Sequence, residues 1–402
     1  ALSYLVAANI EHGLDYFKEM GYHENDETRS AFLKVLSNIL KQGTEFDMTE
    51  EDVDKYYKLN EIIFDPKLEA ILTLCEVTPV TEADAIAQLC CRIFEANQCV
   101  LDLIKASIVY EVSRTEKANT LFRLNSFATK LMVQYCKLIG VEYLRCSVGP
   151  EIRSILANAR PMEMDPAKLP AGQDLTENFQ NVKNSAERFL TDIKNSIPEC
   201  PGPFREICEF LRDTVGAKFP GAEHTAIAGF MFLRFLCPAI IAPDGFRVIN
   251  QPIQDKDSRR SLVLVTKVIQ NLANRVLFVK EPFMECMNPF IEEHMPEIRN
   301  MFDTYATVPE SPPNIQLSFS DEQKEADTGA LHYYLSQSRE KMAKAVAADP
   351  EKQQSNWFEK LTVVLSQLGE PPQPSTKKAA ARPFAPSGGK NVHYEEFMKK
   401  MA

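Results

Sequence analysis

The sequence predicts an all-α protein, and two observations lead to this fold class. Glycine is scarce, at 15 in 402 residues, and neither convincing period-two alternation nor Asn-Gly turns indicate strands or hairpins. Apolar residues instead recur at intervals of three and four, which places them on one face of a helix. A composition of 45% hydrophobic and 25% charged residues is close to the globular average and argues against wholesale disorder.

Helical patterns occur at both ends of the sequence. Near the start, one predicted helix face is lined by Phe32, Val35, Leu36, Ile39 and Leu40, before Gly43. Near the end, another is lined by Leu361, Val364, Leu365 and Leu368, before Gly369 and Pro371 stop the helix. We expect the two ends to pack together as a smaller flanking subdomain.

Proline-rich joints divide the sequence between these ends. Joints at residues 160–170 and 197–203 separate groups of helices, and a third at residues 308–313 closes the central bundle. We therefore expect four parts: the flanking subdomain's first part over residues 1–60, a central domain over 61–315, the flanking subdomain's second part over 316–370, and a Pro-rich linker with a short tail helix over 371–402.

The charge and the cysteines exclude several classes of function. A formal net charge of −11 opposes binding to nucleic acid through a general positive field. Ten cysteines are too few in a chain of this length for a disulfide scaffold, and we expect them to be reduced and mostly in the core, as with Cys90, Cys91, Cys99 and Cys136. No C-x-x-C or H-E-x-x-H spacing is present, so we expect no metal site.

Targeting signals are not expected either. The residues after Ala1 lack a basic region followed by an apolar run, and the most apolar stretch, residues 230–241, is interrupted by Arg234 and Pro238. We therefore expect a cytoplasmic chain without a signal peptide or membrane span. Because it begins with alanine, we expect it to be a domain of a longer protein.

The first segment that can carry chemistry is TLFRLNS, residues 120–126. Asn125 or Ser126 is a natural N-cap for the apolar helical pattern that follows, so Arg123 is expected in the loop just before the helix. An arginine held there can project outward from a rigid support. The alternative is an ordinary solvated loop arginine.

The second segment is GFMFLRFLCPAIIAP, residues 229–243. Arg234 lies among large apolar residues, and we expect Pro238 to end the helix about one turn after it. A guanidinium in such surroundings needs acceptors, and the free carbonyls of a neighbouring loop would suit its fork of donors. The alternative is an arginine that satisfies only its own helix end.

The third segment is SLVLVTKVIQNLANRVLF, residues 261–278. Its apolar stripe consists of Leu262, Val265, Ile269, Leu272 and Val276. The opposite face carries Lys267, Gln270, Asn271 and Asn274, and Lys280 follows the helix. This face offers hydrogen bonding more than bulk charge, although any surface helix has a polar outer face.

Two other patterns do not indicate chemistry. Ser387 to Lys390 lacks the upstream glycine, strand and helix of a phosphate-binding loop. None of the six histidines has the pattern of a nucleophile pair or a metal site.

In this order, the three segments resemble the Ras GTPase-activating protein family, and the match runs from about residue 21 to residue 372. Residues 21–47 and 163–169 are most similar to neurofibromin-type members. Residues 262–291 are also similar to other Ras-specific members. A departure is Cys237, where neurofibromin-type members have asparagine; it concerns the detail of loop support.

The resemblance implies a role for each matching residue. Arg123 corresponds to the arginine finger that enters the active site of a GTP-loaded Ras-type GTPase, and Arg234 to the residue that stabilises the finger loop. The residues implied to bind Ras are Asn125, Leu233, Lys267, Gln270, Asn271, Asn274 and Lys280. The chain would be a GTPase activator and not a complete enzyme, recruited to the membrane where Ras is located.

Cofactors and the alternative function follow from the same resemblance. GTP and Mg²⁺ would be bound by the partner, and the chain would need no cofactor of its own. The alternative is a scaffold like the IQGAP-type relatives, which binds a small GTPase without activating it. Those relatives lack the finger arginine, whereas Arg123 is present here.

Overall fold

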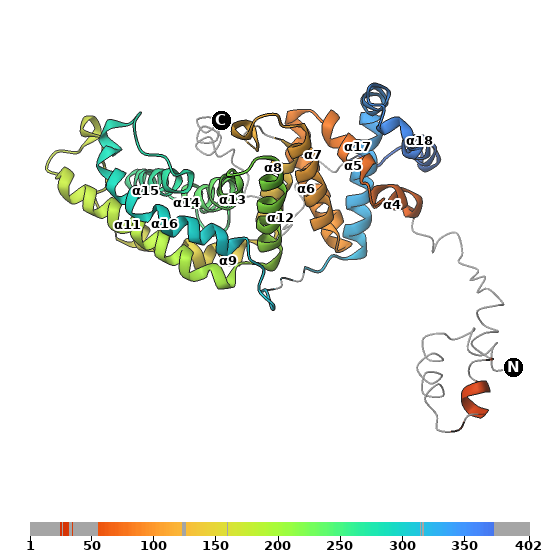
Figure 1. The fold of residues 1–402 in the computed structure, drawn as a ribbon, viewed down its shortest axis with the longest axis horizontal. Helices are drawn as coiled ribbons and strands as arrows, with labels where there is room; N and C mark the ends of the chain where they lie inside the picture. The colour runs from red at the N-terminus through yellow and green to blue at the C-terminus, as the bar shows by residue number, and fades with distance from the viewer. Residues whose placement is uncertain are drawn as a thin grey trace. The chain divides into compact units, whose positions relative to one another are not determined.

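The computed structural model describes residues 25, 27–31, 34, 55–122, 126–158, 160–313, 315 and 317–373 (Figure 1). All regular structure in these ranges is helical, which confirms the predicted fold class. The chain divides into two compact units, residues 1–58 and 59–402. In the first unit, residues 27–31 and 34 are helical. Most of the predicted helix face over residues 32–40 and the predicted tail helix lie outside the described residues, so their packing stays a prediction.

Four helices near the two ends of the described chain are α4 (Tyr57–Ile63), α5 (Glu69–Val77), α17 (Asp321–Ala348) and α18 (Trp357–Leu368). In the second unit α17 packs against α5 and α18, so segments far apart in the sequence lie side by side (Figure 1). Leu361, Val364 and Leu365 are buried on α18, as their spacing predicts. The helix ends before Gly369, whose positive φ of 74° favours glycine.

The next layer consists of α6 (Val80–Ala96), α7 (Val100–Arg114), α8 (Phe127–Ile139) and α12 (Gly202–Lys218). Helix α6 packs against α8, and α7 against α12. The α17 helix is joined to this layer by a bidentate ion pair in which Arg92 of α6 donates to both carboxylate oxygens of Asp327, at 2.8 and 2.7 Å. Such planar pairing fixes direction as well as distance.

The remaining helices form the part of the second unit that lies away from α17 and α18 (Figure 1). They are α9 (Val141–Ser147), α10 (Gly149–Ala157), α11 (Leu175–Ser196), α13 (Glu223–Ala228), α14 (Cys237–Ile241), α15 (Lys256–Asn274) and α16 (Asn288–Tyr305). Helix α11 lies against α9 and α15, and α15 against α14 and α16 (Figure 1). The proline-rich joints fall between helices, as predicted: α10 ends before the first, α12 begins within the second, and the third separates α16 from α17.

Side-chain caps define where several helices begin. Ser126 is the N-cap of α8, with its hydroxyl accepting from the Thr129 N–H at 3.3 Å. Asp174, Asp255 and Ser320 cap α11, α15 and α17 in the same way. Each cap satisfies a backbone donor that has no partner inside its helix. Of the two residues predicted as the α8 cap, the structure selects Ser126.

The cysteines are free thiols, six of them buried: Cys90, Cys91, Cys136, Cys200, Cys208 and Cys237. Among the described residues, one helical run, Glu223–Ile241, has the length and apolar composition to cross a membrane. Of an apolar 18-residue stretch within that run, 72% is buried inside the protein, as in the core helix of a globular domain.

Candidate functional site

The predicted site residues come from three places in the second unit. Leu233 and Arg234 lie in η4 (Gly229–Leu236), a π-helical segment between α13 and α14. Lys267, Gln270, Asn271 and Asn274 lie on α15. Segment η4 packs against both α8 and α15. Arg123 and Asn125 lie outside the described residues, directly before the cap of α8.

The η4 segment is fixed in the core by aromatic side chains. Phe230, Phe232 and Phe235 are fully buried, and the ring of Phe204 lies edge-on to Phe230 and Phe235 at centroid distances of 6.0 and 5.3 Å. Leu233 and Arg234 are only half-buried. The apolar residues therefore anchor the segment and leave Arg234 directed toward a neighbouring loop.

Helix α8 and η4 approach each other closely at Gly140. A methyl group on Gly140 would lie 2.5 Å from the Phe235 ring. Glycine is therefore required by this close approach.

The predicted end of the helix at Pro238 is wrong, because the helical run continues through Pro238 to Ile241. Proline has no N–H to donate. The wider π turn and the position of Pro238 in the first turn of α14 accommodate it. Arg234 is thus part of a continuous helical run and not of its last turn.

Arg234 hydrogen-bonds two main-chain carbonyls. Its Nη1 donates to the oxygen of Gly229 at 3.0 Å, and its Nη2 donates to the oxygen of Phe122. Phe122 is buried and directly precedes Arg123. The guanidinium therefore bonds both its own helical segment and the loop that leads to Arg123.

Glu111, in the last turn of α7, also bonds residues at both ends of the segment 123–125. The Phe122 N–H donates to Glu111 Oε1 at 3.0 Å, and the Ser126 hydroxyl donates to Glu111 Oε2. Sequence reasoning missed Glu111, because nothing in its spacing distinguishes it from other acidic residues near a helix end.

The environment of Glu111 affects its ionisation. Burial raises the pKa of its carboxyl group, although hydrogen bonds from Ser126 and Phe122 and the positive charge of Arg234 oppose this shift. The backbone of Phe122 is in the left-handed region, with φ of 54°, a conformation that residues other than glycine rarely adopt. A backbone of this kind persists where surrounding contacts determine it.

The outer face of α15 presents the predicted polar residues. Lys267, Gln270, Asn271 and Asn274 are half-buried, whereas Leu262, Val265, Ile269 and Leu272 are buried against the core, as their spacing predicts. The amino group of Lys267 forms an ion pair with the carboxylate of Glu281. Any acidic partner group at this position would therefore compete with Glu281.

Val276 does not belong to the buried stripe of α15, contrary to the sequence prediction. Helix α15 ends at Asn274, and Arg275 takes a left-handed conformation with φ of 57°. The chain then changes direction, so Val276 is 54% exposed and Val279 is 76% exposed. Lys280, which follows them, is also exposed.

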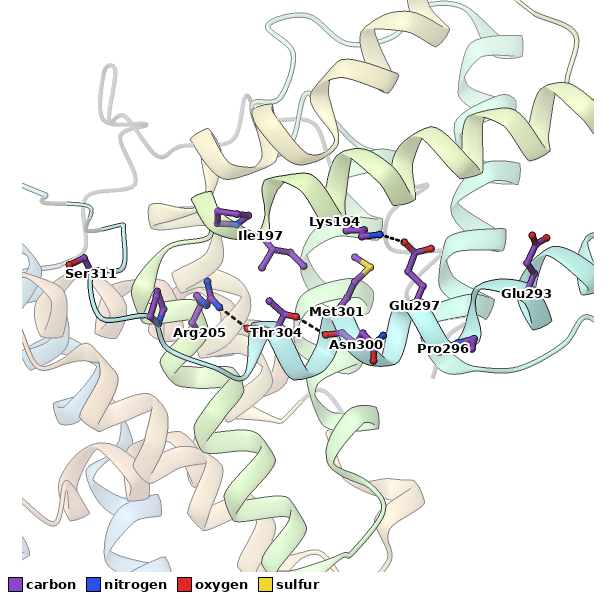
Figure 2. A pocket seen from close by; sticks show the side chains of 12 residues that line it. Lys194, Ile197, Arg205, Glu293, Pro296, Glu297, Asn300, Met301, Thr304 and Ser311 are labelled. Carbon is purple, nitrogen blue, oxygen red and sulfur yellow. Dashed lines mark hydrogen bonds and ion pairs between the residues drawn. The ribbon is translucent and has the colours of Figure 1, made fainter.

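Two cavities are alternative candidates for a binding site. One, of about 770 Å³, is lined mainly by α16, with residues of α11, α12 and the proline-rich joints (Figure 2). Several of its polar groups bond one another: Lys194 pairs with Glu297 at 2.7 Å, and Arg205 Nη2 donates to the Thr304 oxygen at 2.7 Å. No predicted site residue that the structure describes lines it. A second cavity, of about 730 Å³, is lined in part by Glu111 and Ser126.

Comparison with known proteins identifies the class to which this fold and site belong. Residues 103–173 and 170–274 match the family of GTPase-activator proteins for Ras-like GTPases. A probable Ras GTPase-activating-like protein of Dictyostelium discoideum is 35% identical over 328 residues, covering 79% of this chain and 37% of its own length. Ras GTPase-activating protein 1 of Homo sapiens is 30% identical over 286 residues, 69% of this chain and 27% of its own.

A third relative, a GTPase-activating protein of Drosophila melanogaster, is 30% identical over 233 residues, 55% of this chain and 20% of its own length. The chain belongs to the Ras GTPase-activating protein family. The matched part of the chain spans between 20% and 37% of the length of these relatives. The finer resemblance to neurofibromin-type members rests on residues 21–47 and 163–169 and stays a prediction.

Proposed function

We propose that this chain activates GTP hydrolysis by a GTP-bound Ras-type small GTPase and that Arg123 enters the partner's active site. Family membership and the names of the relatives support the activity. The observation that carries the role of Arg123 is the hydrogen bond from Arg234 to the Phe122 carbonyl. A half-buried guanidinium is used there to position the residue next to Arg123.

The chemistry of phosphoryl transfer explains why an arginine would suffice. Charge develops on the phosphoryl oxygens in the transition state, and catalysis depends mainly on stabilising it and on positioning the attacking water. A planar guanidinium can donate to two oxygens at once. An arginine supplied in this way is known to accelerate hydrolysis by Ras about 10⁵-fold. The bond-breaking site would belong to the partner, which would also bind GTP and Mg²⁺.

Docking would use the outer face of α15 and Leu233 of η4. Gln270, Asn271 and Asn274 offer hydrogen-bond donors, Lys267 and Lys280 offer local positive charge on a chain with a net charge of −11, and Leu233 offers an apolar contact. Such local charge can guide an acidic surface without a general positive field. Asn125 would contribute from the finger loop. We place the chain in the cytoplasm, recruited to the membrane by its partner.

The test is single-turnover phosphate release from GTP-loaded Ras, with the chain and with Arg123→Ala. We expect stimulation by the wild type and loss of most of it in Arg123→Ala, while the dissociation constant stays within about tenfold, because the finger acts chiefly on the transition state. Arg123→Lys should also be poor, since lysine lacks the planar fork. A variant Arg123→Ala that keeps more than half of the wild-type rate would contradict the role of Arg123. Binding without stimulation by the wild type would instead support a scaffold.

A further inference from the structure

Glu111 connects the two ends of the loop that contains Arg123. Its two carboxylate oxygens accept from different partners: Oε1 from the Phe122 N–H at 3.0 Å, and Oε2 from the Ser126 hydroxyl. Phe122 is the residue before Arg123, and Ser126 follows Asn125. One side chain therefore bonds the residues on both sides of residues 123–125.

Phe122 is bonded on both sides of its Cα. Its N–H donates to Glu111, and its carbonyl accepts from Arg234. Hydrogen bonds to ionised groups are shorter and stronger than those between neutral groups, and two of them here act on one residue. They come from α7 and η4, and each of these elements packs against α8. This arrangement accounts for the left-handed backbone of Phe122.

Ser126 links the same carboxylate to the start of α8. Its hydroxyl accepts from the Thr129 N–H as the helix cap and donates to Glu111. The point at which α8 begins is therefore tied to the point at which the loop begins. A carboxylate that only capped the end of α7 would not be expected to bond the residues on both sides of residues 123–125, as Glu111 does.

We infer that Glu111 is a positioning residue for Arg123: its carboxylate sets the separation and direction of the loop ends, and Arg234 adds to the support by donating to the Phe122 carbonyl. The inference rests on the proposed function, because its effect on hydrolysis requires that Arg123 acts on the partner. Glu111 acts through Phe122 and Ser126 and does not touch the partner's nucleotide.

The test compares Glu111→Ala and Glu111→Gln with Glu116→Gln, which removes the charge of an exposed carboxylate five residues later. Single-turnover hydrolysis by GTP-loaded Ras is measured over a range of chain concentrations, which separates the rate at saturation from the dissociation constant. Misplacement of a catalytic group by about 1 Å can cost on the order of 10²-fold in rate. We expect Glu111→Ala to lose about 10- to 100-fold at saturation, with the dissociation constant changed less than about threefold.

Glu111→Gln should recover part of this rate, because its amide oxygen can still accept from the Phe122 N–H. Glu116→Gln should match the wild type. Amide hydrogen exchange gives a readout that does not depend on Ras: the Phe122 amide should exchange faster in Glu111→Ala, whereas amides in α12 should be unchanged. If circular dichroism shows that Glu111→Ala is unfolded, Glu111→Gln and Ser126→Ala replace it in the test. Each of these two variants should lose less of the saturating hydrolysis rate than Glu111→Ala would.

The inference is overturned if Glu111→Ala keeps a saturating hydrolysis rate within twofold of the wild type, or if both substitute variants do so where Glu111→Ala is unfolded. It is also overturned if the substitution changes only the dissociation constant for GTP-loaded Ras. An unchanged exchange rate at Phe122 would also overturn it. Failure of the wild type itself to stimulate Ras would contradict the proposed function instead, and the exchange measurement would then still decide whether Glu111 holds the loop.

Discussion

The guanidinium of Arg234 donates a hydrogen bond to the main-chain carbonyl of Phe122, which lies 112 residues earlier in the sequence. Because Phe122 directly precedes Arg123, this contact links a rigid core segment to the loop of the proposed finger. The buried rings of Phe232 and Phe235 on either side of Arg234 hold that segment in place.

Arg234→Ala should therefore lose activity more than stability. The aromatic anchors remain, so we expect a folded chain that binds GTP-loaded Ras, with stimulated turnover reduced by roughly 10- to 100-fold even at saturation. The measurement is single-turnover hydrolysis together with circular dichroism. Arg299→Ala, at an exposed position on α16, is the control. Full activity would make Arg234 an ordinary helical residue, and an unfolded chain would make its role structural throughout.

Lys267→Glu should weaken association and leave the saturating rate nearly normal. The substitution reverses the charge offered to an acidic partner and also places a second carboxylate opposite Glu281. Both effects concern docking and not charge on the phosphate. The dissociation constant for GTP-loaded Ras is measured for this variant and for the double variant Lys267→Glu with Glu281→Lys.

The double variant is the control for the internal ion pair. It restores opposite charges between the two positions but moves the positive charge off α15. If docking needs the lysine on α15, the double variant should remain weak. Recovery of wild-type affinity would show that the pair itself matters, and an unchanged dissociation constant in Lys267→Glu would remove Lys267 from the interface.

Gly140→Ala should destabilise the fold at the junction of α8 and η4. The added methyl group would lie 2.5 Å from the Phe235 ring and 2.5 Å from the Cys136 main-chain oxygen, so both the ring and the backbone would have to move. Overpacking of this kind typically costs about 1 to 3 kcal/mol. Denaturant unfolding measures the loss, and an unchanged free energy of unfolding would mean that both the Phe235 ring and the backbone near Cys136 adjust without cost.

The sequence was informative where local rules apply. The spacing of three and four located the buried stripe of α15 up to Leu272, and the residues before the next apolar helical pattern limited the cap of α8 to Asn125 or Ser126. Local rules could not predict the hydrogen bonds of Glu111 and Arg234 to Phe122, because those bonds depend on how α7, α8 and η4 pack. Two predictions were wrong because the backbone departs from a regular α-helix. A π turn lets the helical run continue through Pro238, and a left-handed Arg275 ends α15 before Val276.

The ionisation of Glu111 predicts opposite trends of stability and activity with pH. Burial raises the pKa of its carboxyl group in the folded chain, so the folded chain binds this proton more tightly than the unfolded chain does. The contribution to the free energy of unfolding is therefore greatest below the ordinary glutamate pKa of about 4.3 and is lost as the pH rises through the raised value.

The stimulated rate should change in the other direction, because the ionised carboxylate is the better acceptor for Phe122 and Ser126. A protonated carboxyl resembles the amide of Glu111→Gln. The ratio of the saturating wild-type rate to the Glu111→Gln rate should therefore fall toward one as the pH drops through the raised pKa, and the ratio cancels any titration of Ras. Over the same window, the free energy of unfolding of the wild type should rise relative to that of Glu111→Gln. A rate ratio that stays constant with pH would show that the charge of Glu111 does not position the loop.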